Sequence, residues 1–445
     1  MTAAVVLELS EYQRVLVGQQ PRPTDADLRL AERLTRGGEQ SARLDVRWLA
    51  NGSVEVTASS WVGVVRFSCL EVVVAPKLAG GTLRVLRMFE YALGIRMLKR
   101  LPTERTLALD GLDLLDLLCL LLTEEAGALV RDGLLRDYQV TDGDLPVLRG
   151  RLRYRDQYLR RAGRVDRLEC HFDDYHGDTP DNQLVAAGLS LARRRAKDAD
   201  IRAAASRLGS IYAEVCEPTT VDAGWFEQRI RYDRRNARYR PAHELAKLVL
   251  RGLAFDDATT RSSVSVGAFL VDMNRVFERF VMRLVDEALA KSSALAVLPR
   301  RRFPALIRDE GTGRTYTAIE PDLIVEDRAS GQRVPVDVKY KLYEARRIAV
   351  SDIYQTFLYA FTVGSAAEGR RAGIVFPAES SVLGPALSIG PTSGPRAATI
   401  ATAGLDVPAA LDALTGAGRE ALMAQVRALV EQLTGFPTSV DATVG

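Results

Sequence analysis

Two aspartates and a lysine between residues 321 and 341 have the types and spacing needed for metal-dependent hydrolysis. Asp322 follows a proline, and Asp337 and Lys339 are the outer residues of an Asp-Val-Lys triplet. Two carboxylates, completed by a backbone carbonyl such as that of Val338 and by waters, suit Mg2+, for which Mn2+ can substitute. Such an ion polarises a phosphate and activates the attacking water, while Lys339 can orient that water or stabilise the charge that develops on phosphorus.

The pattern of side chains around these residues predicts a β-hairpin. Apolar and charged residues alternate from 334 to 341, as on a strand with two different faces. Residues 327–332 have a turn composition, and a loop of this kind places Asp322 opposite Asp337. Two like charges opposite each other on a sheet are unfavourable, so this pair needs a cation, either Lys339 or a divalent metal.

Two helices are predicted to flank the hairpin. Upstream, apolar residues recur at helical spacing from about Val266 to Lys291, and Glu278 borders that stripe. Glu278 is a candidate ligand, directly or through water; the alternative is a salt-bridging flank residue. Downstream, Ser351-Asp352 predicts the start of a helix over 353–363, whose first turn holds Gln355. Gln355 can hold a water or a phosphate oxygen, or it is an ordinary surface glutamine.

The order helix, hairpin, helix and then a short apolar strand at 372–377 resembles the core of the PD-(D/E)xK nuclease superfamily. In that resemblance the motif consists of Pro321-Asp322 and Asp337-Val338-Lys339, and Glu278 and Gln355 join it in the site. A proline-aspartate followed by D-x-K also arises by chance on a solvated hairpin face, so the motif alone leaves this alternative open.

Several further segments resemble McrC, the nuclease subunit of McrBC modification-dependent restriction systems. In the order of that family they are Leu86–Ala92, Leu148–Leu152, Glu169–Tyr175, Asp178–Asn182, Asn274–Phe280, Asp337–Lys341 and Asp352–Gln355. The resemblance implies a DNA endonuclease of an antiviral restriction system, acting on double-stranded, modified DNA. It also implies a partner, a hexameric McrB-like AAA+ GTPase whose GTP hydrolysis the chain stimulates through its N-terminal domain.

Composition agrees with a soluble protein of several domains. The chain contains no G-x-x-x-x-G-K-[ST] motif, so we expect no nucleotide site of its own. Its four cysteines are scattered and it has three histidines, which suggests neither a disulfide framework nor a zinc site. With no signal sequence and no long uncharged apolar run, we expect a cytoplasmic location and no contact with a membrane.

Periodicity divides the chain into three expected domains of an α+β protein. Residues 1–80 contain alternating runs and an Asn51-Gly52 turn signal, which predict a β-rich domain that binds the partner. Helical periodicity dominates residues 81–255, the expected helical middle domain. Residues 256–445 are the expected α/β PD-(D/E)xK endonuclease domain.

Contact with nucleic acid must depend on local patches, because the net charge of the chain is only +3. The densest basic segment is 229–240, in which tyrosines interleave with arginines as on phosphate-gripping or base-stacking surfaces. The candidate DNA-binding residues are Arg231, Arg234, Arg235, Arg238, Arg240 and Lys341. The alternative is a solvated or acid-paired surface.

The sequence therefore favours a Mg2+-dependent endodeoxyribonuclease subunit. Its rival is a non-catalytic adaptor that activates an AAA+ NTPase and only contacts DNA. A nuclease without any GTPase is a third reading, which leaves the β-rich N-terminus unexplained.

Overall fold

The computed structural model describes residues 5–18, 20–36, 42–77, 81–96, 98, 112–164, 166–217, 223–252, 267–341, 343, 347–364, 369–391, 393 and 395–437. These residues form two compact units, which are described separately. Unit 1 contains the described residues up to Gly94 and from Leu270 onward, and unit 2 contains those from Ile95 to Gly252 together with Gly267–Phe269. The boundaries of the three domains expected from the sequence remain predictions.

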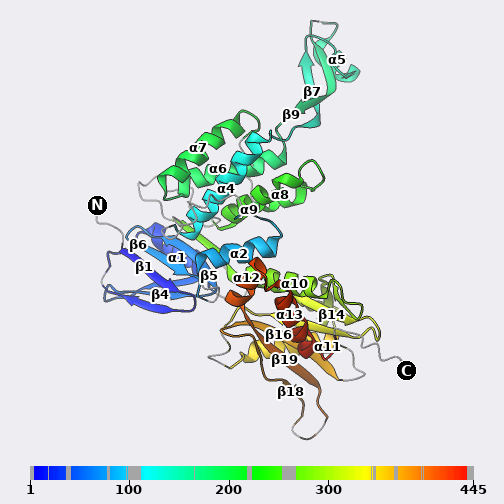
Figure 1. Ribbon diagram of the computed structural model, residues 1–445. Coiled ribbons are helices and arrows are strands. Elements are labelled where there is room, and N and C mark those ends of the chain that lie inside the picture. The colour runs from blue at the N-terminus through cyan, green and yellow to red at the C-terminus, as the bar shows by residue number, and fades with distance from the viewer. Residues whose placement is uncertain are drawn as a thin grey trace. The chain divides into compact units, whose positions relative to one another are not determined.

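Unit 1 begins with a β-rich part made of two small sheets (Figure 1). The first has the order β1-β6-β5-β10 and the second the order β2-β4-β3. The strands are β1 (Val5–Ser10), β2 (Arg14–Val17), β3 (Leu44–Trp48), β4 (Val54–Ala58), β5 (Trp61–Arg66), β6 (Leu70–Ala75) and β10 (Gly267–Asp272), of which Leu270–Asp272 belong to unit 1. Alternation in the sequence predicted β3 to β6, and the turn signal is confirmed, since Gly52 has a φ of 83°. Helix α1 (Asp25–Arg36) buries Leu30 and Leu34.

The C-terminal part of unit 1 is organised around a mixed sheet with the order β11-β14-β15-β16-β19-β17, to which β18 adds on β19. The strands are β11 (Leu295–Leu298), β14 (Leu323–Asp327), β15 (Arg333–Val338), β16 (Arg370–Ala378), β17 (Val382–Leu383), β18 (Leu387–Ile389) and β19 (Ala398–Asp406). A separate ribbon pairs β12 (Phe303–Arg308) with β13 (Thr315–Ile319). Strands β15, β16 and β19 are parallel, whereas β14 runs antiparallel to β15.

Helices cover both faces of this sheet (Figure 1). On one face, Ile374 and Phe376 of β16 pack against residues of α11 (Val350–Val363) such as Phe357. On the other, a Cβ placed on Gly373 would lie 3.2 Å from Leu433 in α13 (Arg419–Thr434), so the absent side chain lets this helix approach closely. Helix α12 (Val407–Thr415) precedes α13.

Helix α10 (Met273–Leu289) connects the two parts of unit 1, because it packs on α2 (Thr82–Leu93) as well as on α13 and β11. Tyr91 of α2 meets Phe280 of α10 edge-on at 5.4 Å between ring centroids, and its hydroxyl lies 2.9 Å from a carboxylate oxygen of Glu287. The N-terminal part is therefore fastened to the sheet that carries the candidate site.

The prediction that a helix runs from Val266 was wrong at its start. Residues Gly267–Asp272 form strand β10, and the Asp272 side chain caps α10 by accepting a hydrogen bond from the Asn274 amide at 3.0 Å. Phe269 and Leu270 thus belong to a strand, because a short apolar run fits either kind of element. The sequence from Phe255 to Ser265, which is rich in Asp, Thr and Ser, predicts a loop before this strand, and that segment lies outside the described residues.

Unit 2 combines a helical bundle with a three-stranded sheet that the sequence did not predict. Its elements are α4 (Leu114–Arg131), β7 (Asp137–Leu145), β8 (Arg151–Leu152), α5 (Tyr154–Arg161), β9 (Leu168–His176), α6 (Pro180–Arg195), α7 (Ala199–Ala213), α8 (Ala223–Arg229), η3 (Ala237–Tyr239) and α9 (Arg240–Gly252). The sheet has the order β7-β9-β8, and Figure 1 shows it extending away from the helices of this unit. None of the helices in the described part of the chain has the length and apolar character needed to cross a membrane.

Candidate active site

The two aspartates of the motif lie side by side at the ends of β14 and β15. The hairpin pairs Glu326 with Arg333 and continues to Leu323 and Val336, so the next step of this predicted register brings Asp322 to Asp337. The backbone amide of Val338 donates a 2.8 Å hydrogen bond to Asp322 Oδ2.

The hairpin is not a solvated face, as the alternative interpretation required. Both strands lie inside the sheet, between β11 and β16, and Asp337 is only 2% exposed. Burial of two carboxylates at one place is costly unless a cation compensates them.

The electrostatics of the pair reflect this cost. Burial, followed by the charges of Asp337 and Glu278, raises the pKa of Asp322 from 3.8 to about 8. Lys339 Nζ lies 3.0 Å from Asp337 Oδ2. Burial lowers the pKa of Lys339, but the carboxylates of Asp337, Asp322 and Asp352 together raise it above its ordinary value, so the ammonium remains charged at neutral pH.

Helix α11 holds the lysine from the other side. Gln355 Oε1 accepts a 2.9 Å hydrogen bond from Lys339 Nζ, and Gln355 Nε2 donates a 2.7 Å hydrogen bond to the hydroxyl of Tyr359. Because the tyrosine engages the amide nitrogen, the amide oxygen faces the lysine. Tyr359 was not predicted as a site residue, although its spacing of four residues from Gln355 places both on one helix face.

Glu278 adopts the salt-bridged arrangement that the sequence left open. Its Oε1 is bound by Arg300, which comes from the segment between β11 and β12. The same guanidinium lies 2.7 Å from Glu320 Oε1 through Nε and 3.7 Å from Asp322 Oδ1 through Nη2. Sequence reasoning missed Arg300 and Glu320, because nothing distinguishes Arg300 within the run Arg300-Arg301-Arg302.

The residues present fit a hard divalent cation with few protein ligands. Among the described residues no group of three or more His, Cys, Asp or Glu side chains is arranged to hold a metal ion, and Glu278 is paired with Arg300. Asp337 Oδ2, however, is buried and receives no aligned hydrogen bond despite the nearby ammonium. A carboxylate pair, supplemented by backbone oxygen and water, is a donor set of the kind Mg2+ takes. The Val338 carbonyl as a ligand remains a prediction.

Lys341 is tied to a buried carboxylate beside the site. Its Nζ lies 2.7 and 2.9 Å from the two oxygens of Asp352, which also accepts a hydrogen bond from the hydroxyl of Tyr343. Asp352 therefore lies in the first turn of α11 instead of capping it, and Ala349 occupies the N-cap position, which corrects the predicted cap. A role for Lys341 in binding DNA stays a prediction.

The N-terminal part of unit 1 touches the residue that follows Lys339. Tyr340 is 1% exposed and donates a 3.1 Å hydrogen bond to Glu11 Oε2, and its carbonyl accepts a hydrogen bond from the hydroxyl of Tyr12. Glu11 Oε2 also accepts from the Lys77 amide at 2.8 Å. The turn between β1 and β2 is thus hydrogen-bonded directly to Tyr340, which follows the end of β15.

The arginine-rich segment of unit 2 does not present its tyrosines for stacking. Tyr239 is fully buried and Tyr232 is half-buried. Arg235 is paired with Asp137 and Asp233 at 2.9 and 3.3 Å.

The other arginines of the segment differ in their partners. Arg238 donates to the Asp132 carbonyl at 3.1 Å, and the Arg240 guanidinium lies 4.7 Å from the ring centre of Tyr232. Arg231 and Arg234 are exposed, and for these two the structure gives no ion pair among the described residues. Binding of DNA by these five arginines stays a prediction.

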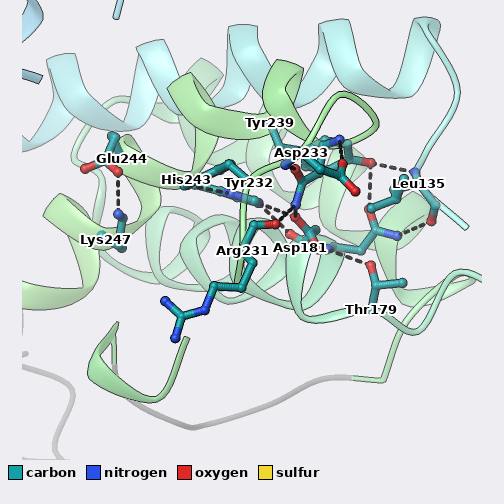
Figure 2. Close-up of polar contacts among 12 residues, drawn as sticks. Leu135, Thr179, Asp181, Arg231, Tyr232, Asp233, Tyr239, His243, Glu244 and Lys247 are labelled. Atoms are coloured by element: carbon teal, nitrogen blue, oxygen red, sulfur yellow. Dashed lines mark hydrogen bonds and ion pairs between the residues drawn. The ribbon is translucent and has the colours of Figure 1, made fainter. Parts of the chain in front are cut away.

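A buried polar network holds this segment in place (Figure 2). Asn236 Nδ2 donates to Asp181 Oδ1 at 3.0 Å, and the Tyr239 hydroxyl donates to Asn182 Oδ1 at 2.8 Å. His243, fully buried beside them, is neutral because burial lowers its pKa to about 3. The network therefore joins Asp181 and Asn182 at the start of α6 to the segment around Asn236.

Comparisons with known proteins give one family and one fold. The model of a family described as "McrBC 5-methylcytosine restriction system component" matches residues 56–377. No curated protein matches the chain.

Among solved structures, the chain is similar to one in the "Refined half-complex from tetradecameric assembly of Thermococcus gammatolerans McrB AAA+ hexamers with bound McrC". The identity is 17%, the TM-score is 0.59, and the match covers 96% of this chain and 100% of that one. A second match, in the cryo-EM structure of the Thermococcus gammatolerans McrBC complex, has 20% identity, a TM-score of 0.48, and coverage of 65% and 90%. The first of these similarities shows a shared fold.

Proposed function

The chain belongs to the McrBC 5-methylcytosine restriction system component family, and on this premise we propose that it is a Mg2+-dependent DNA endonuclease subunit of the McrC type. The observation that carries the proposal is the convergence of Asp322, Asp337 and Lys339 at the buried end of one hairpin. The C-terminal part of unit 1 is then a PD-(D/E)xK core, made of α10, the β14–β15 hairpin, α11 and β16.

Each residue of the site has a defined part in this proposal. Asp322 and Asp337 hold the ion, which when bound supplies a Lewis acid for the scissile phosphate and a more acidic water. Lys339 acts as a cation and not as a general base, because its raised pKa keeps it protonated at neutral pH. Gln355 holds the ammonium beside the carboxylates, where it can stabilise the negative charge that develops on the oxygens of the scissile phosphate during hydrolysis.

A partner follows from the same family. Solved complexes of Thermococcus gammatolerans combine McrB AAA+ hexamers with McrC, and this chain has no Walker A motif of its own. We therefore assign it an McrB-like AAA+ GTPase partner, whose GTP hydrolysis it stimulates and which brings double-stranded, modified DNA to the site in the cytoplasm. The β-rich residues 1–80 are the proposed partner-binding domain, 81–255 the middle domain and 256–445 the endonuclease domain.

The rival function, a non-catalytic adaptor, does not account for the buried acids. Two adjacent carboxylates that are shielded from water destabilise a fold, as the raised pKa of Asp322 indicates. An adaptor has no use for these two carboxylates, whereas a metal-dependent nuclease needs them to bind its ion.

The test compares wild type with Asp337→Asn, which keeps the shape of the side chain and removes its charge. The matched control is Asp286→Asn on the exposed face of α10. With the McrB-like partner, GTP and Mg2+, we expect Asp337→Asn to lose DNA cleavage while it still stimulates GTP hydrolysis, and Asp286→Asn to retain both. Equal cleavage by all three proteins would refute the assignment of Asp337 to a nuclease site. Stimulation of GTP hydrolysis by all three proteins, with no DNA cleavage by any of them, would favour the adaptor function.

A further inference from the structure

Arg300 is the one residue that joins three carboxylates at the edge of the candidate metal site in the described part of the chain. It binds Glu278 on α10, Glu320 just before the hairpin, and Asp322 of the motif. These three acids come from different segments of the chain, so the guanidinium links the helix to the hairpin. Its side chain is 42% exposed, which leaves it room to move toward solvent.

The charges around the hairpin explain why a cation lies there. Glu278, Glu320, Asp322 and Asp337 bring four carboxylates together, and Lys339 accounts for one positive charge beside Asp337. On the other side of the site, Arg300 supplies the positive charge beside Glu278, Glu320 and Asp322. Glu278 and Asp322 are also the groups that a divalent ion next to Asp337 would attract, and a guanidinium and a divalent ion repel each other at such short range.

We propose that Arg300 is the counter-cation of the metal-free site and competes with the divalent ion for Asp322 and Glu278, so that it sets how tightly the site binds metal. The inference rests on the proposed nuclease function, because it takes Asp322 and Asp337 as metal ligands. When the ion binds, the guanidinium leaves Asp322 and Glu278 and keeps Glu320, which lies on the exposed side. At low ion concentration the site then holds no metal, and the charge of Arg300 offsets the charges of Asp322 and Glu278.

A purely structural role for Arg300 makes the opposite prediction. If the guanidinium only clamps the carboxylates in position, its removal lets them separate and weakens metal binding. If it competes with the ion, its removal strengthens metal binding. The sign of the change therefore separates the two roles, independently of DNA cleavage.

The experiment measures Mn2+ binding to the whole chain by electron paramagnetic resonance, in wild type, Arg300→Gln and Arg301→Gln. Arg301 is the matched control, because its exposed guanidinium lies 5.5 Å from the ring centre of Phe303 and not among the acids. We expect Arg300→Gln to bind Mn2+ about tenfold more tightly than wild type, and Arg301→Gln to change by less than about twofold. Arg300→Lys keeps the charge but lacks a guanidinium that can pair with three carboxylates at once. Its affinity for Mn2+ should lie between those of wild type and Arg300→Gln, and it replaces Arg300→Gln in the test if that variant folds poorly.

Asp337→Asn completes the design, because it reports whether the measured ion is at this site. If wild type binds Mn2+ and Asp337→Asn does not, but both Arg300 variants bind it no more tightly than wild type, the competition is refuted while the nuclease proposal stands. If wild type and Asp337→Asn bind Mn2+ equally, the metal is not at the hairpin, and both proposals fail together.

Discussion

Replacing Asp322 by asparagine should make the metal-free protein more stable while it abolishes cleavage. Burial and the neighbouring Asp337 raise the pKa of Asp322 in the folded state from 3.8 to about 8. The folded state thus holds a proton that the unfolded state releases, and the stability of wild type falls as pH rises from about 4 to about 8. Asparagine has no such titration and can still accept the hydrogen bond from the Val338 amide.

The size of the effect follows from the shift. Four pKa units at about 1.4 kcal/mol each give an upper limit of roughly 6 kcal/mol above pH 8. Movement of Arg300 and entry of water lower this limit, so we expect Asp322→Asn to be stabilised by about 2 kcal/mol at pH 8 and by much less at pH 4.

The assay is thermal unfolding in EDTA at pH 4.5 and pH 8, with Asp286→Asn as the control for loss of an exposed carboxylate. The melting temperature of Asp322→Asn should exceed that of wild type at pH 8, and the difference should shrink at pH 4.5. Mg2+ should stabilise wild type and leave Asp322→Asn unchanged. A variant that melts below wild type at pH 8 would refute the account of the carboxylate pair.

Three further predictions concern the surroundings of the site. Tyr359→Phe removes the hydroxyl that orients Gln355, so kcat for cleavage should fall about tenfold with KM for DNA unchanged, and a proportional rise in KM would contradict a positioning role. Tyr340→Phe leaves Glu11 with one hydrogen bond fewer and should lower the free energy of unfolding by about 1 to 3 kcal/mol, measured by denaturant titration; an unchanged midpoint would show that the contact adds nothing. Arg234→Ala should weaken binding to a DNA duplex and reduce its salt slope by about 1, more than Arg235→Ala, whose charge two aspartates already offset, and equal effects would argue against a phosphate contact.

The hairpin could be predicted from the sequence because the signals that determine it lie within one short segment of the chain. Alternation and the turn at 327–332 determine the pairing of Glu326 with Arg333, and this register carries Asp322 to Asp337. Gln355 could be predicted to lie near the site from its place in the first turn of a helix, and it does contact Lys339.

The parts that could not be predicted depend on tertiary contacts. Arg300 reaches Glu278 and Glu320 only after the sheet has formed, and no spacing in the sequence records this. Strands β7 and β9 were missed because polar residues and exposed apolar residues such as Tyr138 and Tyr175 occur together in them. The buried face of β9, which includes Cys170 and Phe172, is too short to produce a clear alternation. Tyr239 was expected on a stacking surface because composition does not report which rings are buried.

The most direct test of the nuclease assignment is cleavage of methylated plasmid DNA by Lys339→Ala beside wild type, with Lys291→Ala as the exposed control. The McrB-like partner, GTP and Mg2+ are present at equal concentrations in every reaction. We expect Lys339→Ala to cleave at least about a hundredfold more slowly than wild type, as for loss of a group that stabilises charge in a transition state, with Lys291→Ala unchanged. Cleavage by Lys339→Ala at the rate of wild type would contradict the assignment of this hairpin as the catalytic site.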